Sequence, residues 1–232
     1  MNHNDDRVLQ VSDLRVTLED EDVLTDLSFI VRRGEVLTIL GPNGAGKTVL
    51  LRALLGAVPY YGVVSWKEGS RIGYVPQRLP YIKSIPLSVA EFFALRQNGG
   101  ADVGKMLEAV GLDAESATKS IGDFSSGQFQ RILIAWALAK DPDVLLFDEP
   151  TAGIDIGGEE TVYGLLSQLQ RERNLTMLLV THDLAVVHRL SSTVLCLNRR
   201  PVCMGPPLAM LTPENLRRLF GTEVTLYEHK HE

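Results

Sequence analysis

Cysteine is scarce in this chain, and long apolar runs are missing. Its two cysteines, Cys196 and Cys203, stand in a sequence of 232 residues. Two are too few for a disulfide framework, and their spacing lacks the close Cys-x-x-Cys pair of a structural zinc site. We therefore expect both to be reduced core residues of a protein in a reducing compartment.

No apolar run is long enough to cross a membrane. The longest, near Ile132 to Ala139, has roughly half of the 20 residues that a spanning helix needs. The first residues, Met1 to Arg7, are polar and acidic, which predicts no signal peptide. Any role at a membrane is therefore expected to depend on a partner.

An excess of basic residues is also lacking. The chain has 23 Lys and Arg against 29 Asp and Glu, a formal net charge of -6. Proteins that bind nucleic acids without a specific site neutralise phosphates with a basic surface. We therefore expect no nucleic-acid partner.

Strand and helix patterns alternate along the chain. An antiparallel hairpin is expected from Val8 to Leu18 and Val23 to Val31, around an acidic turn. Buried strands are expected at Val36–Leu40, Val144–Phe147, Thr176–Val180 and Thr193–Leu197, and helices at Lys47–Leu55, Glu159–Arg173 and Leu184–Leu190. Strands separated by helices indicate an α/β fold with a mostly parallel sheet. We expect one domain over 1–232, with a catalytic core from 1–79 and 129–232.

The middle of the chain is more helical. Ser88 and Glu91 form a capping-box pattern ahead of an apolar run. A second helix is expected at Val103–Val110. We expect a small helical subdomain over 80–128, inserted into the core.

A glycine-rich turn lies between a predicted strand and a predicted helix. Its residues fit the pattern G-x-x-x-x-G-K-[ST]: Gly41, Pro42, Asn43, Gly44, Ala45, Gly46, Lys47 and Thr48. The glycines let backbone N–H groups turn towards a phosphate at a helix N-terminus, where the helix dipole favours anions. Lys47 would reach the β- and γ-phosphates of ATP, and the Thr48 hydroxyl would ligate Mg²⁺. The next residue is Val49, so position 49 offers no second threonine after Thr48.

Two adjacent carboxylates follow the apolar strand at Val144–Phe147. Such a strand carries Asp148 to the C-terminal edge of the sheet, where it can hold Mg²⁺ through water. Glu149 would then orient and deprotonate the water that attacks the phosphate.

A short polar segment, Phe124-Ser125-Ser126-Gly127-Gln128, precedes a helical run about 20 residues before Asp148. It resembles the signature sequence of ATP-binding cassette (ABC) proteins. Other segments follow in the order of that family: Tyr74–Gln77 is similar to its Q-loop, Ala152–Asp155 to its D-loop, and Thr181–Asp183 to its switch histidine segment. The resemblance covers nearly the whole chain and implies a P-loop NTPase fold with ATPase activity.

The resemblance also implies roles for single residues. Two cassettes, here two copies of this chain, would meet head to tail, with each ATP between one P-loop and the other subunit's signature. The signature residues Ser125, Ser126, Gly127 and Gln128 would then face the γ-phosphate in trans, at the positive end of their helix. Gln77 would touch Mg²⁺ or the water, His182 would contact the γ-phosphate, and Asp155 would communicate across the dimer.

Three positions depart from the family pattern. Ser126 replaces the first signature glycine and adds a side chain where the backbone packs closely against nucleotide, so we expect a modest change in ATP affinity. Phe124 replaces a leucine. Leu18 stands where an aromatic residue normally stacks on adenine, so we expect loose discrimination between ATP and GTP.

Four further segments are similar to the cassettes of bacterial zinc and manganese uptake systems. They are Arg71–Gln77, Val194–Arg200, Gly205–Pro207 and Phe220–Gly221. This resemblance implies the ATPase of a metal-ion importer, at the cytoplasmic face of the membrane. Its partners would be an integral membrane permease and, indirectly, an extracytoplasmic metal-binding protein.

Two alternatives stay open. The chain could serve another transporter, for an iron chelate or a lipid. It could also be a soluble single-cassette ATPase, such as one that acts in iron–sulfur cluster assembly.

Two segments invite further interpretations. Residues 78–95 would accept a coupling helix of the permease, with Arg78–Ile82 as apolar and aromatic anchors, or would form an ordinary surface loop. The tail Tyr227–Glu232 carries two alternate histidines that could chelate zinc weakly, although a polar, disordered terminus is the favoured interpretation.

Overall fold

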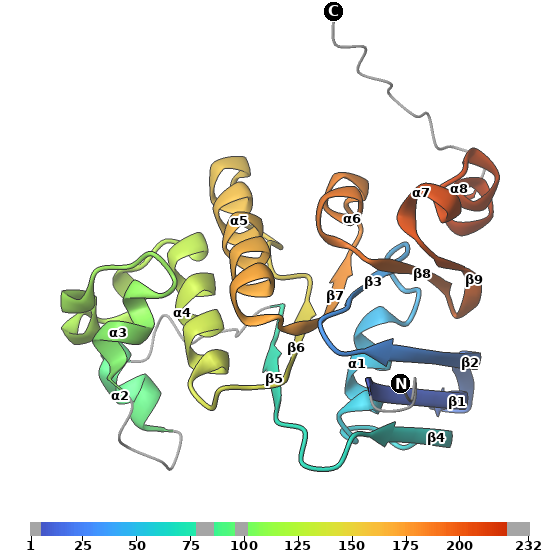
Figure 1. Ribbon diagram of the computed structural model, residues 1–232, viewed down its shortest axis with the longest axis horizontal. Helices are drawn as coiled ribbons and strands as arrows, with labels where there is room; N and C mark the ends of the chain where they lie inside the picture. The colour runs from blue at the N-terminus through green and yellow to red at the C-terminus, as the bar shows by residue number, and fades with distance from the viewer. Residues whose placement is uncertain (1–5, 78–85, 96–101, 222–232) are drawn as a thin grey trace, which may run out of the picture. The chain divides into compact units, whose positions relative to one another are not determined.

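The computed structural model describes residues 6–77, 86–95 and 102–221 (Figure 1). The proposed coupling anchors at 78–82 and the histidine-containing tail lie outside these residues. Contacts divide the chain into two compact units. The first unit comprises Met1–Glu68 and Leu178–Glu232, and the second comprises Gly69–Met177.

An antiparallel sheet forms one layer of the first unit. Its strands are β1 (Arg7–Leu18), β2 (Glu21–Arg32) and β4 (Tyr61–Trp66), in the order β2-β1-β4. The tight turn between β1 and β2 places Glu19 and Asp20 at positive φ, a conformation that Asp adopts more readily than most residues. The predicted hairpin is therefore confirmed, with its turn at the expected acidic residues.

A second group of strands in the first unit has the order β7-β3-β8-β9. The bounds are β3 (Val36–Leu40), β7 (Thr176–Thr181), β8 (Thr193–Asn198) and β9 (Arg200–Gly205), and β7 runs into this unit from the second. Strand β3 pairs with β8 in parallel and is buried at every residue, as a continuous apolar run predicts. Strand β9 was not predicted, because Pro201 and the polar start of this segment disfavour a central strand. It pairs with β8 alone among the described strands, at the edge of the sheet, where proline is tolerated.

The described residues of the first unit form the helices α1 (Lys47–Leu54), α6 (Leu184–Leu190), α7 (Pro207–Met210) and α8 (Pro213–Phe220). Helix α8 begins after Thr212, whose hydroxyl accepts a hydrogen bond from the Asn215 N–H at 3.2 Å. Its Leu216 and Leu219 are buried in a cluster with Leu40, Val187, Val194 and Cys196. This cluster anchors the C-terminal helices onto β8.

The expectation that both cysteines are reduced is wrong in this structure. Cys196 on β8 and Cys203 on β9 lie opposite each other in the antiparallel register and form a disulfide. Their Cα atoms are 4.9 Å apart, within the range that a disulfide spans. The spacing of the two cysteines did not indicate this bond, because the β8–β9 hairpin that brings them together was not predicted.

The described residues of the second unit form parallel strands and helices. Strands β5 (Ile72–Val75) and β6 (Val144–Asp148) pair in parallel, in the order β5-β6-β7. The helices are α2 (Val89–Ala94), α3 (Val103–Glu108), α4 (Ser126–Leu138) and α5 (Ile156–Arg173), with the short 3-10 helices η2 (Ala114–Thr118) and η3 (Ile121–Asp123). Because β5 and β6 in this unit and β3 and β8 in the first are parallel pairs, and β1, β2 and β4 form an antiparallel sheet, the predicted α/β class is confirmed. The limits of the helical subdomain, 80–128, stay a prediction.

Local hydrogen bonds stabilise the start of α2 and link the end of α3 to α4. The predicted capping box at Ser88 and Glu91 is confirmed, and hydrogen bonds from the Ser88 side chain and backbone lower the pKa of the Glu91 carboxyl. Arg131 on α4 donates hydrogen bonds from its Nη1 to the carbonyls of Gly111 at 2.7 Å and Val110 at 3.3 Å. Burial lowers the pKa of Arg131. The start of α4 is therefore tied to the end of α3.

Within the described part of the chain, none of the helices combines the length and the apolar composition needed to cross a bilayer.

The disulfide gives the first testable prediction. A cross-link that closes a loop of this size stabilises a protein by about 2.5 kcal/mol through the entropy of the unfolded chain. Oxidised wild-type protein should therefore melt about 5 °C above the Cys203→Ser variant. Calorimetry with and without dithiothreitol measures this difference, which should vanish under reduction. Two thiols that react with an alkylating agent in the folded, oxidised wild-type protein would contradict the pairing.

Candidate functional site

The glycine-rich loop of the first unit connects β3 to α1. Gly46 is the N-cap of α1, with a φ of 90°, and a side chain there would begin 2.6 Å from a methyl carbon of Leu24. Both the backbone conformation and the lack of space therefore require glycine. The buried ammonium group of Lys47 donates hydrogen bonds to the carbonyls of Gly41 at 2.8 Å and Pro42 at 2.9 Å. Lys47 thus folds back over the loop, at a helix start whose N–H groups favour a phosphate.

The first turn of α1 continues with Thr48 and Val49, both half-buried. The side chain of Val49 is aliphatic, so position 49 lacks the hydroxyl group that a threonine would offer to a phosphate. Val49 therefore has no side-chain group that could bind a nucleotide phosphate, and position 49 provides no threonine for this role. Thr48 supplies the hydroxyl group of this turn.

The two adjacent carboxylates lie at the end of β6 in the second unit. All five residues of β6 are buried, and Asp148 is only 3% exposed. The hydroxyl of Tyr74 on the neighbouring strand β5 donates a hydrogen bond to Asp148 Oδ2 at 3.3 Å. The parallel register places Tyr74 opposite Leu146, which brings its hydroxyl to the end of β6. Sequence reasoning missed this role because it depends on the register.

The side chains of Gln77 and Glu149 are in direct contact in the second unit. The Gln77 Nε2 atom donates a hydrogen bond to Glu149 Oε2 at 2.8 Å. Glu149 has a φ of 46°, a left-handed conformation that costs a residue other than glycine about 1–3 kcal/mol and often marks functional sites. Just beyond it, the buried Thr151 hydroxyl and the Tyr163 hydroxyl are 2.9 Å apart and hydrogen-bonded. This contact, which the sequence did not predict, anchors the loop after Glu149 to α5.

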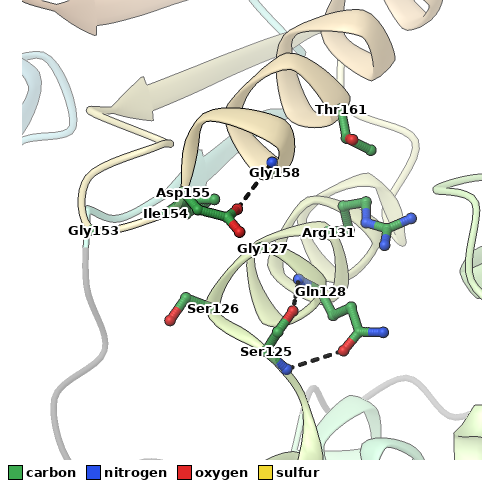
Figure 2. A pocket seen from close by; sticks show the side chains of 10 residues that line it. All are labelled: Ser125, Ser126, Gly127, Gln128, Arg131, Gly153, Ile154, Asp155, Gly158 and Thr161. Atoms are coloured by element: carbon green, nitrogen blue, oxygen red, sulfur yellow. Dashed lines mark hydrogen bonds between the residues drawn. The ribbon is translucent and has the colours of Figure 1, made fainter.

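The signature segment forms the start of α4. Ser125 is the N-cap, and its hydroxyl accepts a hydrogen bond from the Gln128 N–H at 3.2 Å (Figure 2). In return, the Ser125 N–H donates to Gln128 Oε1 at 3.0 Å. The pattern S-x-x-Q could have revealed this capping box from the sequence. Ser126 is the first residue of the helix and is exposed, with no positive φ, so its side chain causes no backbone strain in the chain itself.

A pocket of about 310 Å³ is lined by the start of α4 and the start of α5 (Figure 2). Asp155 is the N-cap of α5, and its Oδ1 accepts a hydrogen bond from the Gly158 N–H at 3.0 Å. The lining residues are Ser125, Ser126, Gly127, Gln128, Arg131, Gly153, Ile154, Asp155, Gly158 and Thr161. The structure thus brings the predicted signature and the predicted D-loop aspartate to one pocket. Two helix starts and several hydroxyl groups make it suitable for the anionic end of a ligand.

His182 directly follows β7, in the first unit, and its side chain is exposed. The next residue, Asp183, caps α6 by accepting a hydrogen bond from the Ala185 N–H at 2.7 Å. The glycine-rich loop belongs to the same unit as His182, while Gln77, Asp148 and Glu149 belong to the other. A single site formed by both groups stays a prediction, as does the effect of Leu18 on base recognition.

The expected magnesium ligands suit that ion chemically. Thr48, Gln77 and Asp148 offer a hydroxyl, an amide oxygen and a carboxylate, and Mg²⁺ prefers such oxygen ligands together with water and substrate phosphates. Among residues 6–77, 86–95 and 102–221, no three His, Cys, Asp or Glu side chains gather in a way that could hold a metal ion.

Comparisons with known proteins agree with these motifs. The family described as ABC transporter matches residues 24–152. A zinc import ATP-binding protein ZnuC of Cereibacter sphaeroides is 44% identical over 215 residues, 91% of this chain and 88% of that protein. The protein of the same name from Paracoccus denitrificans is 42% identical over 216 residues, 90% of this chain and 85% of that protein.

Solved structures share the fold. The chain resembles cbiO1 from Clostridium perfringens, part of the ABC transporter complex cbiONQ, with a TM-score of 0.77 and 28% identity. The match covers 92% of this chain and 94% of cbiO1.

The backbone of Glu149 gives the second testable prediction. Glu149→Gly and Glu149→Ala both remove the carboxylate, but only glycine adopts a φ of 46° without steric cost. The free energy of unfolding of Glu149→Gly should therefore be about 1 kcal/mol higher than that of Glu149→Ala, so the glycine variant is the more stable one. Urea denaturation followed by circular dichroism measures the difference. Equal stability of the two variants would show that position 149 carries no backbone strain.

Proposed function

Since this chain belongs to the ABC transporter family, we propose that it hydrolyses ATP to energise the import of zinc through a separate membrane permease. One observation carries the choice of zinc. Relatives named zinc import ATP-binding protein share 42% and 44% sequence identity with this chain, over nearly its whole length. Manganese is the competing cargo, because it shares the resemblance found in the sequence.

The P-loop binds the phosphates of ATP in this proposal. Lys47, whose ammonium group now bonds to two carbonyls of its own loop, turns to the β- and γ-phosphates when ATP enters. Thr48, Gln77 and Asp148 would hold Mg²⁺, which neutralises charge on the phosphates during transfer. Tyr74 keeps Asp148 oriented through its hydroxyl.

Glu149 is the proposed general base. Gln77 donates a hydrogen bond to one of its carboxylate oxygens, which orients the carboxylate that accepts a proton from the attacking water. The left-handed backbone at Glu149 fixes the direction in which its side chain leaves the loop. His182 would contact the γ-phosphate and stabilise the geometry of the transition state.

Two copies of the chain form the proposed working unit. The pocket surface formed by Ser125 to Gln128 and Asp155 would face the ATP that is held on the P-loop of the second copy. ATP closes this dimer, and hydrolysis with product release opens it again, which switches access through the permease. The subunit would lie at the cytoplasmic face of the membrane, and an extracytoplasmic protein would deliver zinc to the permease.

Transport is the direct test of this proposal. Tagged Glu149→Gln, trapped with Mg-ATP, should recover a multi-span membrane protein from solubilised native membranes. Vesicles that contain this partner and the wild-type chain should take up radioactive zinc in the presence of ATP. Because a general base contributes about a hundredfold or more to the rate, Glu149→Gln should reduce uptake by at least that factor.

Lys47→Ala serves as the control that cannot bind ATP. Uptake of an iron chelate or a lipid in place of zinc would redirect the proposal to another transporter. Recovery of soluble proteins alone would contradict the transport role.

A further inference from the structure

The disulfide between Cys196 and Cys203 lies close to the turn of the β8–β9 hairpin. Leu197 follows Cys196 directly and pairs with Pro201, and the register of the hairpin shifts between these two pairs. Proline has no N–H group to donate to the ladder, and the turn itself places Arg199 at a φ of 61°. The disulfide is therefore a covalent tie beside an irregular hairpin end.

The turn of this hairpin supports the P-loop (residues 41–48) through backbone contacts within the first unit. The Arg199 N–H donates a hydrogen bond to the Ala45 carbonyl at 3.0 Å, and the Arg199 carbonyl accepts one from the Thr25 N–H at 2.9 Å. A side chain on Gly41 would collide with the Leu197 carbonyl oxygen, so the two backbones are as close as glycine permits. The conformation of the P-loop therefore depends on the position of the turn.

Reduction of the disulfide loosens this support. Strand β9 pairs with β8 alone among the described strands and lies at the edge of the sheet (Figure 1). An edge strand opens locally more readily than a central one, and without the cross-link its register next to Pro201 is less firmly specified. When the turn moves, the Ala45 carbonyl loses its hydrogen bond from Arg199. ATP then binds only the fraction of molecules in which the P-loop is ordered, which lowers the apparent affinity.

The two cysteines differ in accessibility. Cys196 is fully buried, with 0% exposure, while Cys203 is half-buried. Attack of a thiolate on a disulfide sulfur requires access to the thiolate. A small external disulfide therefore reaches Cys203 first, and Cys196 completes the bond from inside.

We propose that Cys196 and Cys203 are a reversible redox modification site that sets the affinity of the P-loop for ATP, with low-molecular-weight disulfides as the oxidant. The cross-linked form binds ATP more tightly than the dithiol form. This inference rests on the part of the proposed function that places ATP on the P-loop, and it is independent of the metal that is transported.

The exchange is balanced for oxidised glutathione as the oxidant. The Cys203 thiolate attacks one glutathione sulfur, the S–S bond of glutathione breaks, and one glutathione thiolate leaves. The Cys196 thiolate then attacks the Cys203 sulfur and displaces the second glutathione thiolate. The two protons of the protein thiols pass to the two glutathione molecules, which are reduced as the cysteine pair is oxidised. A dithiol reductant reverses both steps.

ATP binding in the two redox states is the direct test. Calorimetric titration with a non-hydrolysable ATP analogue, well below the melting temperature, compares wild-type protein treated with oxidised glutathione and with dithiothreitol. The Kd should be about fivefold higher in the reduced protein, which corresponds to a P-loop that is ordered in about a fifth of the molecules. Cys203→Ser, which cannot form the cross-link, should match the reduced protein under both treatments.

Hydrogen exchange separates the proposed effect on the turn from a general loss of stability. The amide of Arg199 should exchange at least about fivefold faster in the reduced protein, because exchange follows the population of the locally open state. The Glu91 amide, which donates to Ser88 at the start of α2 in the second unit, serves as the matched control. Its exchange rate should be the same in both redox states.

Mass spectrometry tests which cysteine is modified first. Cys196→Ser treated with oxidised glutathione should accumulate a mixed disulfide on Cys203. Cys203→Ser should stay unmodified, because its remaining cysteine is buried. Folded Cys196→Ser without the mixed disulfide would contradict a modification site at Cys203.

The outcomes distinguish this inference from the proposed function. Equal Kd values for the oxidised and reduced wild-type protein would show that the disulfide only stabilises the hairpin, and would overturn the inference while ATP binding stands. A Cys203→Ser variant whose Kd still responds to oxidised glutathione would also overturn it. Absence of ATP binding in both redox states would overturn the proposed function together with the inference.

Discussion

The complete burial of β6 is the constraint on which the site depends. Phe147 is fully buried, and the charged residue that follows it, Asp148, is nearly so. A shift of one residue in the pairing of β6 with β5 would turn every side chain to the opposite face. It would also take Asp148 away from the Tyr74 hydroxyl, at a large cost for a buried carboxylate. The apolar core thus fixes the position of the carboxylates with the accuracy that phosphate chemistry needs.

The loop that follows β6 is also conformationally restricted, from Glu149 to the pocket. Glu149 adopts a left-handed conformation, the next turns are closed by backbone hydrogen bonds, and Asp155 caps α5. Each of these features restricts the next, because the loop contains only a few residues. The proposed base and the surface expected to meet a second copy are therefore parts of one continuous, tightly turned segment.

Much of this fold could be predicted from local patterns. Strand β3 and the start of α1 follow from an apolar run and a glycine-rich turn, and the capping box at Ser88 follows from a spacing of three residues. These signals are local, so the surrounding chain is not needed to interpret them. The order of the motifs was sufficient to identify the family.

Contacts between distant residues could not be predicted in this way. The hydrogen bond from the Tyr74 hydroxyl depends on the register of β5 and β6. The disulfide depends on the β8–β9 hairpin, which was not predicted because β9 begins with polar residues. The close approach of Ile154 to Gly127 and Gly158 depends on how the starts of α4 and α5 lie relative to each other. Ser126 is a different case: the sequence predicted an altered nucleotide affinity from its side chain, and the structure shows that the side chain is compatible with the first turn of α4.

A crystal structure of Glu149→Gln with Mg-ATP tests the central claim most directly, because it shows where each surface lies when nucleotide is bound. The expected result is a symmetric dimer with two ATP molecules, in which Lys47 of one copy and Ser125 of the other contact the same γ-phosphate. ATP held on the P-loop alone, with Ser125 of both copies remote from any phosphate, would contradict it.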